Sequence, residues 1–146
     1  MDAINWKIVT NLQQDGRISF AELGKLVHLS APAVAERVKK LEEAGIITGY
    51  KASVNLERLG YPIMAMIQVK TFLGKEKEFI RLSKSSSEIL ECYNVTGDKA
   101  FLLKVTVATM SKLDSLLEEF STISETSTMI VLSNIVADAI VQAPTS

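Results

Sequence analysis

Apolar residues recur at helical spacing over roughly the first 50 positions and at strand spacing afterwards. Ile4, Ile8 and Leu12 lie four residues apart, so they share one stripe of a helix. Asp2 is a suitable N-cap for that helix, because its carboxylate can accept from a free backbone N–H. The pattern ends before Asp15. The chain therefore begins with an amphipathic helix.

Two more helices are expected before residue 46. Ser19 with Glu22 three positions later is a capping box, which predicts a helix that buries Leu23 and either Leu26 or Val27. After the short link His28-Leu29, Ser30 caps a third helix with Pro32 in its first turn, where a missing N–H costs nothing. That helix should end at Gly45 and should bury Val34, Val38 and Leu41.

Helices two and three, joined by so short a turn, predict a helix-turn-helix. On the third helix, Ala33, Glu36, Arg37 and Lys40 share a face separate from the apolar one. A small residue with basic residues behind it suits insertion into the DNA major groove, which is about 12 Å wide. Residues 17–40 hold five basic and two acidic residues, a net charge of +3, whereas residues 61–146 carry −2. This local charge favours a polyanion-facing surface.

The second half predicts a different architecture. Residues 46–54 are expected to form a strand that leaves the helical unit, and Leu59-Gly60-Tyr61-Pro62 a hinge. The pattern after the hinge is β-α-β-β-α-β, the ferredoxin-like split βαβ plan. Strands are expected over 63–72, 89–95, 100–108 and 128–136, and helices over 75–83 and from a cap at Ser111. The fold class is α+β, a (winged) helix-turn-helix plus a ferredoxin-like domain, with domains at 1–50 and 63–146 and a linker at 51–62.

The predicted strands are apolar on both sides. A sheet with helices on one face should carry polar residues on the other, yet the second face would hold Met64, Met66, Leu90, Cys92 and Leu102. We expect this face to pack against another copy of the chain, and the alternative is ordinary scatter of exposed apolar residues.

Composition narrows the class of protein. Hydrophobic residues make up 47% and charged residues 23%, which is typical of globular chains. No apolar run approaches the roughly 18 residues of a membrane span, and no secretory signal opens the sequence. We expect a cytoplasmic protein that does not associate with membranes. The chain has one cysteine, Cys92, which we expect to be a buried core thiol, and one histidine, His28. Two such residues cannot form a metal cluster or a catalytic set. We therefore expect neither enzyme activity nor a cofactor.

Several segments together resemble one known family. They are Ser19 to Gly24, Leu29 to Ile47 and Gly49-Tyr50 in the first half, and Cys92 to Asp98, Leu102 to Val105 and Thr126 to Leu132 in the second. In this order they are similar to the Lrp/AsnC, or feast/famine, transcription regulators. The match covers nearly the whole chain, which makes it far more specific than an isolated helix-turn-helix pattern.

The resemblance implies a DNA-reading helix-turn-helix over residues 20–39. It also implies homodimers built through the C-terminal sheets, which in this family often assemble further into tetramers, octamers or discs. It also implies an amino acid or related metabolite bound between subunits near the loop from Val95 to Ala100. The effector-binding set is Tyr93, Val95, Thr96, Gly97, Asp98, Lys99 and Ala100. Ala100 stands where the family often has an acid, which leaves Asp98 to hold a ligand ammonium. Asn5 likewise replaces a frequent acid.

For DNA, Arg37 is the strongest candidate, contacting either a guanine or a phosphate. The alternative is an ion pair with Glu36 or with another helix. Lys39 and Lys40 are expected on phosphates, and Glu36 either accepts from a cytosine amine or is simply solvated. The DNA-binding set is Ser30, Ala31, Pro32, Ala33, Glu36, Arg37, Lys39 and Lys40, with Lys25 and Arg17 as weaker backbone contacts.

The function predicted is therefore a multimeric, sequence-preferring regulator that binds double-stranded DNA under the control of an effector. An architectural protein that wraps DNA with little sequence preference, or without an effector, is the alternative. An enzyme is a third possibility, because split βαβ domains also host catalysts.

Overall fold

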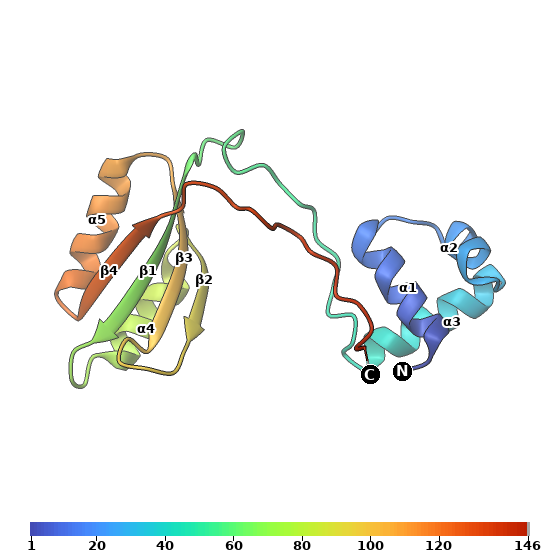
Figure 1. The fold of residues 1–146 in the computed structure, drawn as a ribbon. Coiled ribbons are helices and arrows are strands. Elements are labelled where there is room, and N and C mark those ends of the chain that lie inside the picture. Colours follow the sequence, from blue (N-terminus) through green and yellow to red (C-terminus); the bar gives the residue numbers. More distant parts are fainter. Residues whose placement is uncertain (146) are drawn as a thin grey trace. The chain divides into compact units, whose positions relative to one another are not determined.

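The computed structural model describes residues 1–145, which form two compact units (Figure 1). The first unit contains Met1–Ser53 and the described residues from Val136 onward, and the second is Val54–Ile135. The sequence placed a linker at 51–62 and assigned everything from 63 on to one domain. The structure instead divides the chain at Ser53 and returns its last segment to the first unit.

The first unit contains three helices, α1 (Ala3–Gln14), α2 (Phe20–Val27) and α3 (Ala31–Glu43). All three predicted caps are confirmed. The side chain of Asp2 accepts from the backbone N–H of Asn5, Ser19 forms both halves of its capping box with Glu22, and the Ser30 hydroxyl accepts from the N–H of Ala33. These caps satisfy backbone donors that a helix leaves free at its start.

The apolar faces predicted for the helices meet in one core. Ile8 of α1, Leu23 and Val27 of α2, and Val34, Val38 and Leu41 of α3 are buried together, while Leu26 is 52% exposed. His28 adopts a left-handed conformation with φ of 59° and ends α2. That sharp turn brings α3 directly after α2. The helix-turn-helix is thus held by its own small core.

The strand expected over 46–54 is absent from the residues that the structure describes. Ile46 and Ile47 donate from their backbone N–H groups to the carbonyl of Leu41, which closes the end of α3 instead of extending a ladder. Tyr50 then donates its hydroxyl to Glu42 at 2.8 Å. Burial and this bond raise the pKa of Tyr50 to about 12, so the hydroxyl is protonated at neutral pH. Local helix capping therefore overrides the strand-like composition.

A C-terminal segment completes the first unit. Gln13 on α1 donates to the carbonyl of Val141 at 3.1 Å and accepts from its N–H at 2.9 Å, a pairing across 128 positions. Val141 also lines an apolar cavity of about 400 Å³ that includes Trp6, Val9 and Ile47. The two hydrogen bonds and this apolar contact explain why residues from Val136 group with the helices.

The second unit has the predicted split βαβ order. Its elements are β1 (Ile63–Thr71), α4 (Glu76–Ser85), β2 (Ile89–Asn94), β3 (Phe101–Val107), α5 (Met110–Ser121) and β4 (Ser124–Ile130). The strands form one antiparallel sheet in the order β2-β3-β1-β4. Both helices cover the same face (Figure 1). Phe79 lies in the centre of the core, with its ring 4.8 Å from that of Phe101 and 5.3 Å from that of Phe120.

The predicted limits of β4 and the predicted start of α5 are wrong. β4 begins at Ser124, four residues before the predicted start, because Ser124 to Ile130 pair with β1 from Thr71 back to Ala65. The apolar residues beyond Ile130 caused the strand to be predicted as far as residue 136, although Leu132 and Ile135 are almost fully exposed. Helix α5 begins earlier than expected because Thr109, not Ser111, caps it by accepting from the N–H of Lys112.

Of the apolar residues that the strand pattern predicted on the second face of the sheet, Met64, Met66 and Leu102 lie there, whereas Leu90 falls at an irregularity in the pairing of β2. Met66 lies opposite Lys104 on β3 and Met129 on β4, so these side chains share the face without helices. Cys92 instead lies opposite the buried Leu103, on the helix side and at the edge strand. Its thiol is exposed, so the prediction of a buried core cysteine is wrong; an edge strand has no neighbour to cover it.

Candidate nucleic-acid interface and ligand-binding loop

Helix α3 presents a slim, exposed first turn. Ser30 ends the turn after α2, Pro32 is exposed, and Ala31 and Ala33 are half-buried. The Ser30 hydroxyl already accepts the N–H of Ala33 at 3.3 Å. Beyond this turn, a groove of about 400 Å³ is lined by Asn5, Leu29, Ala33, Glu36, Arg37 and Lys40. The face predicted from helical spacing therefore exists as one continuous surface.

Lys40 on this surface and Lys39 next to it in the sequence are each paired with an acid one turn away. Lys40 Nζ lies 2.8 Å from Glu36 Oε1, and Lys39 Nζ lies 3.7 Å from Glu43 Oε1. The hydrogen bond from Lys40 lowers the pKa of Glu36, which keeps that carboxylate ionised. All four side chains are well exposed, and exposed pairs of this kind contribute little to stability. Both lysines can therefore exchange a carboxylate for a DNA phosphate at small cost.

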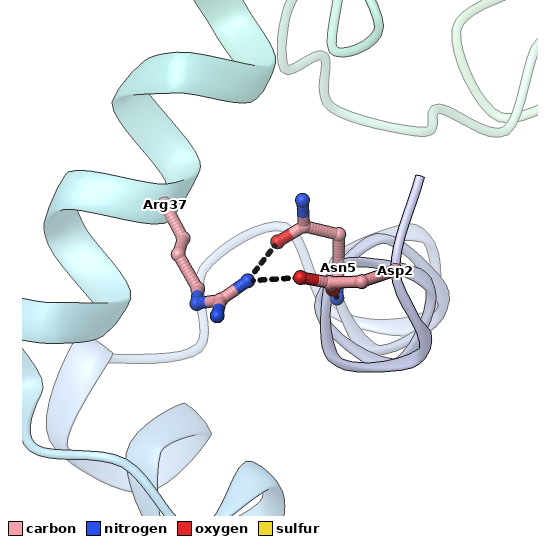
Figure 2. A network of polar contacts seen from close by, with 3 residues as sticks. All are labelled: Asp2, Asn5 and Arg37. Atoms are coloured by element: carbon pink, nitrogen blue, oxygen red, sulfur yellow. Dashed lines mark hydrogen bonds and ion pairs between the residues drawn. The ribbon is translucent and has the colours of Figure 1, made fainter.

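Arg37 is held by helix α1 (Figure 2). Its Nη1 donates to Asp2 Oδ2 at 2.8 Å and to Asn5 Oδ1 at 2.9 Å. The other oxygen of Asp2 caps α1 by accepting from the N–H of Asn5 at 2.7 Å. The hydrogen bond from Arg37 lowers the pKa of Asp2, so the ion pair persists at neutral pH and is lost only as pH falls below the carboxyl's ordinary range. Of the alternatives open for Arg37, the tie to another helix is present in the structure.

The weaker DNA candidates lie apart from this groove. Lys25 is exposed in the last turn of α2, and Arg17 is exposed in the loop between α1 and α2. The backbone N–H of Arg17 donates to Asp15 at 2.8 Å, which fixes that loop. Neither side chain lines the groove of α3, so contacts from them would reach only the flanking backbone.

The predicted effector loop is a tight turn between β2 and β3. The N–H of Val95 donates to the carbonyl of Ala100 at 2.7 Å, and Gly97 has φ of +109°, a conformation that favours glycine. Asp98 Oδ1 lies 3.0 Å from the ammonium of Lys70 on β1. Lys99 and Ala100 are half-buried, Thr96 is exposed, and the Tyr93 hydroxyl donates to Glu91.

Asp98 thus already holds an ammonium in the structure, which comes from the chain itself. The hydrogen bond with Asp98 raises the pKa of Lys70, so this ammonium stays charged over the physiological range. Both side chains remain largely exposed, and a ligand could replace either partner. A zwitterionic amino acid has the charges to do so, since its ammonium matches Asp98 and its carboxylate matches Lys70.

Sequence reasoning missed three residues of these sites. The sequence predicts Asp2 only as a helix cap and marks Asn5 only as a replacement for a frequent acid, and no pattern singles out Lys70. Asp2 and Arg37 are 35 positions apart, and Lys70 and Asp98 belong to different elements. Opposite charges at such separations carry no periodic signal, so only the folded chain could pair them.

Among the described residues, no three His, Cys, Asp or Glu side chains gather in a way that could hold a metal ion. No helix over residues 1–145 has the length and apolar character needed to cross a bilayer.

Comparison with known proteins agrees with this architecture. A model of the AsnC-type helix-turn-helix domain matches residues 1–42, and one of the Lrp/AsnC ligand binding domain matches residues 64–141. The leucine-responsive regulatory protein of Haemophilus influenzae is 41% identical over 120 residues, which are 80% of this chain and 72% of that protein. The transcriptional regulator FL11 of Pyrococcus furiosus is 36% identical over 135 residues, covering 90% and 89%.

Solved structures of similar proteins share the fold. The structure of LrpC from Bacillus subtilis has a TM-score of 0.89 at 29% identity and covers 92% of this chain and 96% of that one. A transcriptional regulator from Neisseria meningitidis, solved as a complex with L-Met, has a TM-score of 0.89 at 26% identity, covering 99% and 96%.

A helix-turn-helix followed by a ligand-binding domain of split βαβ topology defines a DNA-binding transcription regulator with an effector-binding domain. The chain belongs to the Lrp/AsnC family. The relatives of the chain are transcriptional regulators.

Proposed function

We propose that the protein is a multimeric, sequence-preferring regulator whose occupancy of DNA is set by an amino acid or related metabolite bound between subunits. The observation that carries the proposal is the exposed surface of α3. Its core residues are buried, while Pro32, Glu36, Lys39 and Lys40 are exposed on the remaining faces. A helix that is slim at its first turn and presents exposed lysines further along fits the major groove between two phosphate backbones.

Multimerisation is supported by the uncovered face of the sheet. Met66 and Met129 are neighbours across paired strands there, and Leu102 lies opposite Tyr93 on the same face. A second copy packed on this face would bury these side chains and would present two α3 helices to one duplex. Two DNA-binding heads, each the helix-turn-helix of one copy, favour half-sites that lie one helical turn apart or a multiple of it. A single head cannot select such a spacing.

An effector is supported by the Lys70–Asp98 pair beside the turn at Gly97. A ligand can regulate only if it binds one assembly or conformation better than another. An amino acid that separates this pair would change the charge and the shape of the loop at the subunit boundary. That difference gives the ligand a route to favour one arrangement of the DNA-binding heads.

Removing the ammonium groups of Lys39 and Lys40 should weaken binding to all DNA sequences alike. In the K39A/K40A variant we expect a shallower dependence on salt. The slope of the logarithm of the DNA association constant against log salt concentration should decrease in magnitude by about 0.9 for each phosphate that is no longer neutralised. Shift assays at several salt concentrations with a selected operator and with random DNA measure both effects. K75A removes a lysine that is likewise paired with a glutamate, 3.2 Å away on α4, and should change nothing.

The same assay tests the proposed function itself. A wild-type protein that binds operator and random DNA equally well would instead be an architectural protein that wraps DNA. An unchanged salt slope in K39A/K40A would remove both lysines from the interface.

Replacing Asp98 should abolish the response to amino acids. Thermal unfolding with each of the twenty L-amino acids identifies one that stabilises the wild type; a single site at 100 times its Kd gives about 2.7 kcal/mol. We expect D98N to lose this stabilisation because an amide cannot balance the ligand's ammonium. D114N makes the same change at an exposed site on α5 and should respond like the wild type. The effector proposal fails if no amino acid shifts unfolding or if D98N still responds.

A further inference from the structure

The geometry points to Arg37 as a specificity-determining residue that recognises a guanine, with Asp2 and Asn5 as the residues that position its guanidinium. This inference rests on the proposed binding of DNA by α3. It adds a division of labour within the interface, in which Lys39 and Lys40 supply attraction to the backbone and Arg37 supplies base recognition.

The hydrogen bonds of Arg37 use only one end of its guanidinium. Both bonds leave from Nη1, one to Asp2 Oδ2 and one to Asn5 Oδ1. No group among residues 1–145 accepts from Nε or Nη2. Figure 2 shows Nη1 turned to the two oxygens, with the other terminal nitrogen directed away from them. The Nε–Nη2 edge is therefore an intact pair of parallel donors, and such a fork matches two acceptors side by side.

The position of Arg37 gives this fork access to the interface. The side chain is 31% exposed and lines the groove of α3 together with Ala33, one turn earlier. Side chains on a helix lean toward its N-terminus, and the methyl group of Ala33 leaves the space in that direction open. The fork therefore lies on the flank of α3 behind the turn that would enter the major groove.

The neighbouring carboxylate favours a base over a phosphate. Asp2 neutralises Arg37 at a distance of 2.8 Å, so the pair as a whole has no net charge. A phosphate placed on the fork would gain little long-range attraction and would meet repulsion from Asp2. The O6 and N7 atoms of guanine are neutral acceptors with the spacing of the fork, so they keep the hydrogen bonds without that repulsion.

The same contacts prearrange the guanidinium. Two oxygens on α1 hold Nη1 before DNA arrives, so less side-chain freedom is lost on binding. A lysine at this position could keep the ion pair with Asp2, yet it has no second edge to offer. We therefore expect R37K to bind DNA without recognising the guanine.

The experiment begins with an operator selected from random DNA by the full-length wild type. Each guanine is then replaced singly by 7-deazaguanine, which lacks the N7 acceptor. We expect one guanine per half-site at which this replacement weakens wild-type binding about 5- to 100-fold. R37A and R37K should bind the normal and the replaced operator equally, with melting temperatures that show a folded protein.

Asp2 and Asn5 are tested by two variants with matched controls. N5A leaves the charge unchanged and should reduce the discrimination of guanine severalfold, whereas N11A, on the same helix and bonded only to the carbonyl of Lys7, should not. D2N keeps a capping side chain but gives Arg37 a net positive charge, so binding to random DNA should strengthen while discrimination falls. D15N makes the same charge change at the other end of α1 as its control.

Two results would overturn the inference. One is that R37A weakens every sequence equally and lowers the salt slope, which identifies a phosphate contact. The other is that the wild type discriminates 7-deazaguanine and R37A discriminates it equally well. A wild type that selects no operator at all would instead refute the proposed function, so the two failures are distinguishable.

Discussion

Replacing Gly24 with valine is expected to unfold the helix-turn-helix and to abolish DNA binding. Gly24 is buried in α2, and a Cβ atom built there would lie 2.5 Å from the carbonyl oxygen of Leu29. This oxygen belongs to the turn between α2 and α3, so relief of the clash must move the backbone that places α3. Overpacking a core costs about 1–3 kcal/mol, and we expect the upper end because backbone rather than a side chain must yield.

Alanine provides a sharper version of the same test. Glycine to alanine inside a helix ordinarily stabilises it by up to about 1 kcal/mol. At Gly24 we expect the opposite sign, since even one methyl group meets the Leu29 carbonyl. Denaturant unfolding of the full chain, followed by the fluorescence of Trp6, measures the change. A21V adds bulk at an exposed position of the same helix and should unfold like the wild type. A more stable G24A would show that the turn is not closely packed.

Replacing Met66 with lysine is expected to dissociate the assembly and to weaken operator binding. Met66 lies on the uncovered sheet face, between Lys104 and Met129 on the flanking strands. A second ammonium beside Lys104 would place two like charges on the face that we propose packs against another copy. Separation of the paired heads removes the gain from bivalent binding, which is about 10²- to 10⁴-fold.

Sedimentation velocity and shift assays with a two-half-site operator measure the two effects of M66K together. L73K adds the same charge at a fully exposed apolar position in the loop after β1 and should leave both unchanged. If M66K sediments like the wild type, the sheet face is not the contact between copies. If M66K dissociates but binds the operator with wild-type affinity, one DNA-binding head is sufficient for operator binding.

Local signals allowed most of the fold to be predicted. The caps at Asp2, Ser19 and Ser30 were identified correctly because a cap depends on residues three positions apart. The buried stripe of α3 followed from helical periodicity for the same reason. β4 was misplaced because its limits are set by pairing with β1, and Ser124 to Ser127 pair there although they are polar.

The candidate sites likewise contain features that the sequence predicts and features that depend on folding. The groove of α3 and the turn around Gly97 could be predicted, since each depends on a short run of sequence. The ties from Asp2 to Arg37 and from Lys70 to Asp98 could not, because side chains from separate elements meet only after folding. In the candidate sites, one tie leaves Arg37 a single free edge, and the other pairs Asp98 with Lys70.

The bond between Gln13 and Val141 changes how this protein should be dissected. A fragment truncated at residue 53 would keep all three helices yet lose both hydrogen bonds to Val141 and one wall of the cavity that Trp6, Val9 and Ile47 also line. Its affinity for DNA would then be that of an incomplete module.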